Sequence, residues 1–161
     1  MFSEFKYTNR DNFYKMLSKN NPDLVNITQD LERHLKLFGM PVHYTSVGSI
    51  TTKYRGYEYK FTIFDDWKEI RVIAMFAQCY TKTKEQTLQI LNLANDVSFH
   101  SAPAIAWFSD DELYSVANMR YESSKINPND FIYVMRSCDS AIRNFSSRSI
   151  FYKSLRECCE L

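Results

Sequence analysis

The hydrophobic positions of this chain switch between two periods, and each switch predicts a new element. Phe13, Met16 and Leu17 fall on one helical face and predict a short first helix. Over the next, longer segment, apolar residues recur at helical spacing at Ile27, Leu31, Leu35 and Phe38. Asn26 followed by Gln29 resembles a capping box at the start of this helix. Gly39 and Pro41 supply the signals that end it.

From residue 42 onward the period changes to two, which is the period of a β-strand. Residues 42–54 are rich in β-branched and aromatic types, and Arg55 with Gly56 makes a tight turn. Residues 57–63 then alternate between apolar and polar side chains. This strand should therefore have one buried face and one wet face.

The next strand shows a different pattern. It follows a turn at Asp65 and Asp66 and runs over residues 70–77. From Val72 onward its side chains are apolar on both faces. A strand of this kind is predicted to be central in the sheet and covered at least partly on both sides.

A third helix is predicted from Thr83 and Gln86, which form another capping box. A wide apolar stripe follows at Leu88, Ile90, Leu91, Leu93, Ala94 and Val97. Such a wide stripe predicts a helix that lies deep in the core. Asn92 and Asn95 are expected to end this helix, because Asn tolerates the left-handed conformation found at helix ends.

Two further strands, residues 104–108 and 113–121, are predicted to pair across the acidic turn at 110–112. A last helix begins with Asn127 as its cap and Pro128 at its first position. Its apolar seam consists of Phe131, Met135, Cys138, Ile142 and Phe145.

The resulting order is helix, helix, three strands, helix, two strands, helix. It predicts an α+β fold, an antiparallel sheet of about five strands with helices packed mainly on one face. The 161 residues fit one domain with a substantial core. We expect an N-terminal helical extension over 1–25, a single α+β domain over 26–147 and a C-terminal tail helix over 148–161.

Composition narrows the partners and the compartment. The formal charge of +1 creates no global field that attracts nucleic acid or an anionic membrane. No apolar run approaches the length of a membrane span, and the first residues lack the apolar core of a signal peptide. The four cysteines, Cys79, Cys138, Cys158 and Cys159, have no CxxC spacing. We therefore predict a cytoplasmic protein with free thiols.

The segment from Leu88 to Tyr121 carries a resemblance to a known family. The residues that carry it are Leu91, Asn92, Asn95, Phe99, the strand at 104–108, Asp110-Asp111, Leu113 and the helix start Asn127-Pro128. From about Asn26 to Phe145 the chain resembles the YbjN-like domains, which share the fold of type III secretion chaperones. The resemblance implies protein binding. Type III chaperones are small dimers that hold partner segments on apolar patches, and YbjN-like proteins are described as regulators without a defined catalytic site.

The leading functional hypothesis is a non-enzymatic protein-binding module, a chaperone-like or regulatory adaptor that docks a segment of a partner protein. Homodimerisation stays open. Large aromatic side chains anchor many interfaces, and this chain has more of them than its wet faces require. The candidate partner-binding residues are Tyr54, Tyr57, Tyr59, Trp67, Phe108 and Tyr114. The competing interpretation is that these side chains belong to the core or form cross-strand pairs.

An enzymatic alternative rests on the acidic turns. Asp65-Asp66 and Asp110-Asp111-Glu112 could serve a small hydrolase or a metal-assisted enzyme, although hairpin turns commonly carry such residues. The three glycines are too scattered for a phosphate-binding loop. His34 lies on an apolar helical stripe and is predicted to be a core histidine. We predict no catalytic, cofactor-binding or metal-binding residue.

The Tyr-rich hairpin and the C-terminal cysteines allow two further interpretations. Lys53, Arg55 and Lys60 interleave with tyrosines on one hairpin, which could bind single-stranded nucleic acid. The balanced charge and the element order disfavour that alternative. The neighbouring Cys158 and Cys159 could be redox-active, or they could continue the apolar stripe of Phe151 and Leu155 on a tail helix.

Overall fold

The computed structural model describes residues 6–161 and consists of two compact units. The first unit contains the chain up to Val72 together with Asn118–Tyr133. The second unit contains Ile73–Ala117 together with Val134–Leu161. The expected N-terminal extension belongs to the first unit and the expected tail helix to the second.

The first unit combines helices with an antiparallel sheet of order β1-β2-β3-β4-β5-β7. Its own elements are β1 (Tyr7–Thr8), α1 (Arg10–Asn20), the 3₁₀ helix η1 (Pro22–Leu24), α2 (Val25–Leu37), β2 (His43–Thr45), β3 (Ile50–Tyr54), β4 (Tyr57–Phe64) and β8 (Lys125–Ile126). Three elements run through both units: β5 (Glu69–Cys79), β7 (Glu112–Glu122) and α4 (Pro128–Ser149).

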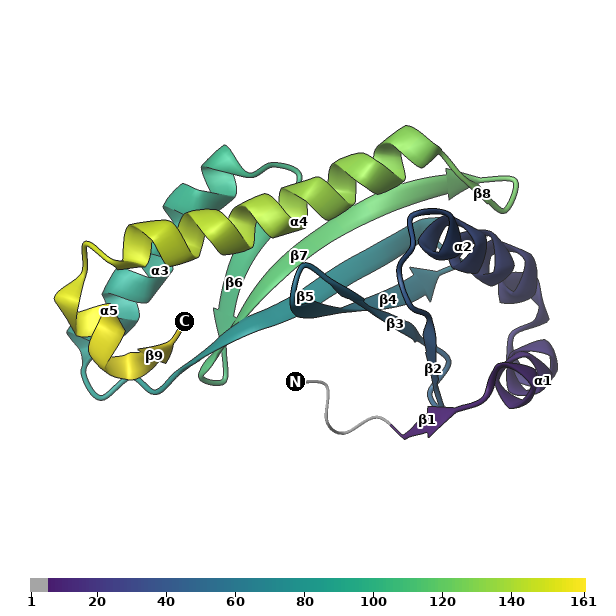
Figure 1. Ribbon diagram of the computed structural model, residues 1–161, viewed down its shortest axis with the longest axis horizontal. Coiled ribbons are helices and arrows are strands. Elements are labelled where there is room, and N and C mark those ends of the chain that lie inside the picture. The colour runs from purple at the N-terminus through teal and green to yellow at the C-terminus, as the bar shows by residue number, and fades with distance from the viewer. Residues whose placement is uncertain (1–5) are drawn as a thin grey trace. The chain divides into compact units, whose positions relative to one another are not determined.

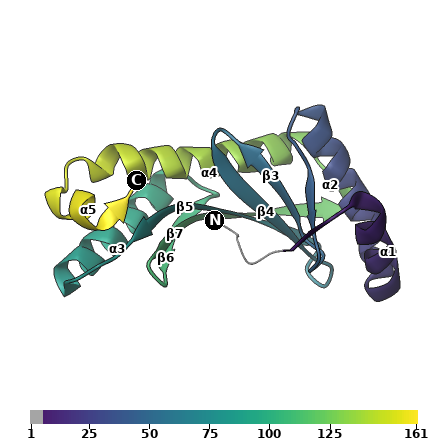
Figure 2. The same ribbon diagram turned by 60° about the horizontal axis from the view of Figure 1, so that its bottom comes forward.

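The second unit is also α+β, with strand order β5-β7-β6. Its own elements are α3 (Lys84–His100), β6 (Ile105–Ser109), α5 (Lys153–Cys158) and β9 (Cys159–Glu160). Within the second unit, α4 lies on one face of β5 and β7, since Phe76 of β5 and Ser115 of β7 both contact it. Figures 1 and 2 show α3 beside α5. The fold class predicted from the sequence is confirmed.

Two buried carboxylates on α2 hold the first unit together. Glu32 accepts hydrogen bonds from Arg10 Nε at 2.9 Å and from the Tyr14 hydroxyl at 2.7 Å, which ties α1 to α2. Asp30 accepts the backbone N–H of Ile126 at 2.8 Å, which ties β8 to α2. Buried carboxylates need such partners, because an unpaired buried charge is strongly destabilising.

These contacts also set the protonation of Glu32. Burial by itself would raise the pKa of this carboxyl, but hydrogen bonds from Arg10, Lys36 and Tyr14 outweigh burial and lower the pKa to about 2. Glu32 is therefore ionised at neutral pH, although its side chain is almost completely buried.

The helix boundaries confirm some of the local predictions and contradict others. The capping box of Thr83 and Gln86 is present, and α4 begins at Pro128 as predicted. The capping box at Asn26 is wrong, because α2 continues directly from η1 and Leu24 stands at its cap. Asn92 and Asn95 do not end α3 either. This helix continues to His100, and both side chains are exposed on its outer surface.

The sheet contains nine strands among residues 6–161, where about five were predicted. Residues 42–54 divide into β2 and β3 around a turn. β1, β8 and β9 are strands of only two residues each. Strands this short carry no periodic signal, because a period of two needs several residues to be recognised. Within the described residues, no helix is both long and apolar enough to cross a membrane.

The prediction of four free thiols is wrong for two cysteines. Cys79 and Cys159 form a disulfide, whereas Cys138 and Cys158 are free and buried. β9 pairs antiparallel with the end of β5, and this pairing places Cys159 directly opposite Cys79. The two residues are 80 positions apart in the sequence, so their spacing gives no indication of the bond.

Candidate functional site: an apolar sheet face in the second unit

The strands of the second unit direct alternate side chains to opposite faces. Phe76 of β5 packs against Phe145 of α4, with ring centroids 5.6 Å apart. The Ser115 hydroxyl of β7 donates a hydrogen bond to the Cys138 carbonyl of α4 at 3.1 Å. Because successive side chains alternate, the neighbouring residues of both strands point away from α4.

The face away from α4 carries apolar side chains from three strands. β6 and β7 pair so that Trp107 lies opposite Tyr114 and Ile105 lies opposite Val116. Directly opposite residues share a face, so these four side chains lie together. β5 adds two more residues by alternation. We call the whole set the apolar sheet face: Ile73, Met75, Ile105, Trp107, Tyr114 and Val116.

Much of the apolar sheet face is in contact with solvent. Trp107 is 54% exposed and Ile105 is 41% exposed. The other four side chains are partly exposed. Large exposed apolar side chains are common singly, but a group on neighbouring strands is typical of an interaction surface.

An acidic turn adjoins this face. Asp110 and Asp111 connect β6 to β7 with φ of 53° and 63°, the left-handed conformation that a tight hairpin turn requires. The next residue, Glu112, accepts a hydrogen bond from the Tyr114 hydroxyl. Burial and then this hydrogen bond raise the pKa of Tyr114 to about 12. Carboxylates therefore border the apolar sheet face at the β6–β7 turn.

In the first unit, the corresponding side chains of the same two strands are polar. Arg120 of β7 approaches Glu69 of β5 at 3.6 Å. Arg71 Nε donates a hydrogen bond to Asn118 Oδ1 at 3.3 Å. The polar groups of these side chains bind one another across the strands. A polar surface of this kind gains little free energy when a partner protein covers it.

The aromatic residues predicted from the sequence as a partner site are distributed over both units. Tyr54 and Tyr57 lie opposite each other on β3 and β4, and both are partly buried. Tyr59 is fully buried, with its ring centroid 6.0 Å from that of Tyr54. A buried ring cannot stack on a base, so Tyr59 gives no support to the nucleic-acid alternative. Trp67 is 63% exposed at the β4–β5 turn.

The two remaining candidates lie in the second unit on different faces. Phe108 is opposite the buried Leu113, which places it on the side that α4 covers. Tyr114 is the one predicted residue on the apolar sheet face. The sequence did contain a signal for this face, since the residues of β5 from Val72 onward are apolar on both faces of the strand. That pattern predicts a strand covered at least partly on both sides, and Ile73 and Met75 are partly buried.

The acidic turns give little support to a hydrolase. Asp65 accepts hydrogen bonds from Lys68 Nζ at 2.6 Å and from the Tyr121 hydroxyl at 3.0 Å, and these bonds lower its pKa. An ionised carboxyl has no proton to donate to a leaving group. Asp65 lines a cavity of about 450 Å³ with Asp23, Asp66 and Trp67. Within residues 6–161, no three His, Cys, Asp or Glu side chains are placed to hold a metal ion.

His34 has the core position predicted for it. It is buried, and its Nδ1 lies 2.8 Å from the carbonyl oxygen of Asp30, to which it donates. Its ring lies 5.6 Å from that of Phe131. These contacts are those of a structural side chain.

The outer surface of α3 carries additional exposed apolar residues. Leu88 and Leu91 belong to the stripe that was predicted to be buried, but both are exposed. Ile90, Leu93, Ala94 and Val97 form the buried side of the helix. The stripe is wider than one packing partner can cover, which explains why part of it remains in solvent.

Comparisons with known proteins identify the fold. No family model matches the chain, and no curated protein matches its sequence. Among solved structures, YbjN from E. coli, described as a candidate transcription regulator, superposes with a TM-score of 0.55 at 15% identity, over 78% of this chain and 93% of that one. A chain of the HopA1–SchA chaperone–effector complex superposes with a TM-score of 0.57 at 8% identity, over 79% of this chain and 98% of that one.

This chain has a YbjN-like, type III chaperone-like fold. The resemblance seen in the sequence is therefore confirmed at the level of the fold. Identities of 15% and 8% indicate shared architecture and carry no residue roles.

Proposed function

We propose that this protein is a non-enzymatic binding module, a chaperone-like or regulatory adaptor, that docks a segment of a partner protein on the apolar sheet face. The observation that carries the proposal is the cluster of six apolar side chains on three adjacent strands, with Trp107 more than half exposed. Aromatic and aliphatic side chains on a rigid sheet form effective anchors, since they lose little conformational freedom on binding.

The charges around this face suggest the chemistry of the partner. Asp110, Asp111 and Glu112 border it with carboxylates. Complementary charges steer association and fix register. We therefore expect an apolar segment flanked by Lys or Arg. The likeness to a chain from a chaperone–effector complex supports protein binding in general. The proposal keeps the cytoplasmic location predicted from the sequence.

Site-specific photocrosslinking tests the proposal. The change Trp107→p-benzoylphenylalanine places a crosslinker on the apolar sheet face, and Trp67→p-benzoylphenylalanine is the matched control at an exposed tryptophan of the first unit. Crosslinking in native cells followed by peptide mass spectrometry should identify one apolar, basic-flanked segment at position 107 and not at position 67.

Titration with the identified segment then measures the contribution of Trp107. Trp107→Ala should weaken binding about 30-fold, since removing an anchor of this kind costs about 2 kcal/mol. Trp67→Ala should change the affinity less than about threefold. Adducts only with a second copy of the chain would show a self-association surface instead, and light scattering over a dilution series would reveal the dimer. Equal crosslinking at both positions, or none at 107, would refute the docking proposal.

A further inference from the structure

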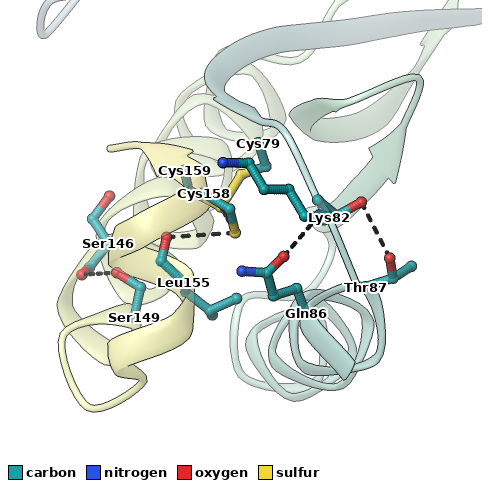
Figure 3. Close-up of a disulfide and its surroundings, with 10 residues drawn as sticks. Cys79, Lys82, Gln86, Thr87, Ser146, Ser149, Leu155, Cys158 and Cys159 are labelled. Atoms are coloured by element: carbon teal, nitrogen blue, oxygen red, sulfur yellow. Dashed lines mark hydrogen bonds between the residues drawn. A yellow bond between two sulfur atoms is a disulfide. The ribbon is translucent and has the colours of Figure 1, made fainter. Parts of the chain in front are cut away.

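Three of the four cysteines converge where β5 ends (Figure 3). Cys79 and Cys159 are joined by the disulfide, and Cys158 Sγ lies 3.8 Å from Cys159 Sγ. The fourth cysteine, Cys138, is buried on α4. A free thiol beside a disulfide sulfur is the arrangement from which thiol–disulfide exchange begins.

The disulfide fastens a tail that has few other attachments. Residues 153–161 comprise α5, β9 and Leu161. β9 contributes two residue pairs with β5, and the Tyr80 N–H donates to the Cys158 carbonyl at 2.8 Å. Leu155 is buried, and the Ser154 hydroxyl donates to Gln89 of α3. A two-residue strand is too short to hold on its own, so the covalent bond matters for the attachment.

The three sulfurs differ in their access to solvent. Cys79 has no exposed surface, whereas Cys158 and Cys159 are 7% and 9% exposed. An external thiol can therefore approach the tail cysteines more readily than Cys79. Burial raises the pKa of the Cys158 thiol, so only a small fraction is thiolate at neutral pH and the exchange is slow.

We propose that Cys79, Cys158 and Cys159 form a thiol–disulfide exchange site that fastens the C-terminal tail to β5, and that a dithiol reductant opens it. In the first step the Cys158 thiolate attacks Cys159 Sγ. The Cys158–Cys159 bond forms, the Cys79–Cys159 bond breaks, and Cys79 leaves as a thiolate that takes up the proton given up by Cys158. This step involves no net oxidation.

In the second step the dithiol reduces the Cys158–Cys159 disulfide. Two electrons and two protons pass to the tail cysteines, and the dithiol becomes a disulfide. All three cysteines are then thiols, and the tail is held only by noncovalent contacts. In a reducing compartment, disulfides are commonly transient and redox-sensing, which agrees with this use.

Release of the tail would uncover backbone groups at the end of β5. Gln78 loses its pairing with Glu160, and the Tyr80 N–H loses its hydrogen bond to the Cys158 carbonyl. The Cys79 N–H keeps its own hydrogen bond, because it donates to the Asp111 carbonyl at 2.7 Å. Amide hydrogen exchange reports this change directly, because paired N–H groups exchange slowly.

The experiment uses the full chain, oxidised in air, and the variants Cys158→Ala and Cys138→Ala. Acid quenching, alkylation and peptide mapping should find the Cys79–Cys159 crosslink in all three proteins. Dithiothreitol is then added at neutral pH, and hydrogen exchange is followed at residues 78, 80 and 153–161, with residue 79 as an internal reference because its N–H bonds to Asp111. In Cys158→Ala the release of the tail should be about tenfold slower, because the internal nucleophile is missing. Cys138→Ala should differ from the parent less than about twofold, because Cys138 takes no part in the exchange.

Two results would overturn the proposal. The first is the absence of the Cys79–Cys159 crosslink from oxidised native protein. The second is release at equal rates in the parent and Cys158→Ala. Thermal unfolding of each oxidised variant checks that the fold is intact, and Cys158→Ser replaces Cys158→Ala if the alanine variant fails that check. Because none of these measurements involves a partner, the outcome is independent of the proposed docking function.

Discussion

The strands β5 and β7 present two different surfaces away from α4. In the first unit they carry Glu69, Arg71, Asn118 and Arg120, whose side chains pair across the strands. In the second unit they carry Ile73, Met75, Tyr114 and Val116. The backbone is the same kind of antiparallel sheet in both places, so the difference lies in the side chains alone. A polar surface is well solvated by water, so covering it brings little free energy. Covering an exposed apolar surface with a partner is favourable, because it removes apolar area from water.

The largest effect that we expect concerns the stability of the first unit in acid. The folded-state pKa of Glu32 is lowered to about 2, below its ordinary value of 4.5. The stabilisation from Glu32 is therefore complete above about pH 4.5 and is lost as the pH falls towards 2. The shift corresponds to about 3 kcal/mol. Denaturant titrations across this range should show the loss, and hydrogen exchange should increase first in α1 and α2.

The variant Glu32→Gln is the control for that measurement. It should be less stable than the parent at pH 7, and its stability should vary less between pH 4.5 and pH 2, because no carboxyl remains to titrate at this position. If both proteins lost stability in parallel over this range, another group would be responsible.

Exchanging the polar side chains of the first unit with the apolar side chains of the second unit, on β5 and β7, tests the comparison of these two surfaces most directly. The double variant Ile73→Arg with Val116→Asn gives the apolar sheet face the residue types of Arg71 and Asn118. We expect binding of the crosslinked segment to fall about 30-fold or more. The free energy of unfolding should change by less than about 1 kcal/mol, since partly exposed positions tolerate polar residues.

The reverse exchange in the first unit is the matched variant. Arg71→Ile with Asn118→Val should increase retention on a hydrophobic column without creating affinity for the segment. Partner binding that survived the first exchange, or appeared with the second, would show that apolar character does not define the site.

A smaller effect concerns α3. Because its end is not capped by Asn95, Asn95→Ala should stabilise the protein by about 0.5 kcal/mol, which is the difference in helix propensity at an exposed position. If Asn95 ended the helix, Asn95→Ala would instead destabilise the protein. Thermal unfolding measured side by side with the parent distinguishes the two.

The smallest effect defines the border of the binding surface. Leu91→Gln removes an exposed apolar side chain from α3. If binding is confined to the sheet, the affinity for the segment should change less than about twofold. A tenfold loss by isothermal titration would extend the site onto this helix.

Local chemistry could be predicted from the sequence wherever neighbouring residues decide it. The starts of α3 and α4 were predicted correctly, because capping depends on residues within one turn. The start of α2 was not, since a preceding 3₁₀ helix replaced the cap. The end of α3 was misplaced, because Asn92 and Asn95 sit exposed in mid-helix, where a polar residue costs little.

Features that depend on distant contacts could not be predicted. The Cys79–Cys159 bond requires the pairing of β9 with β5, and nothing near either cysteine specifies that pairing. The apolar sheet face was missed for a different reason. Its pattern along β5 is the same whether the chain itself or another molecule covers the side chains, so periodicity alone cannot distinguish these cases.

The division of the chain between the two units has a consequence for biosynthesis. The first unit needs Asn118–Tyr133, and the second unit lies in between and continues to Leu161. A ribosome therefore finishes neither unit until it has translated residue 133. While synthesis proceeds, β5 emerges well before its neighbour β7 and leaves a strand edge open. An unpaired strand edge is a template for pairing with another chain, so aggregation competes with folding during that interval.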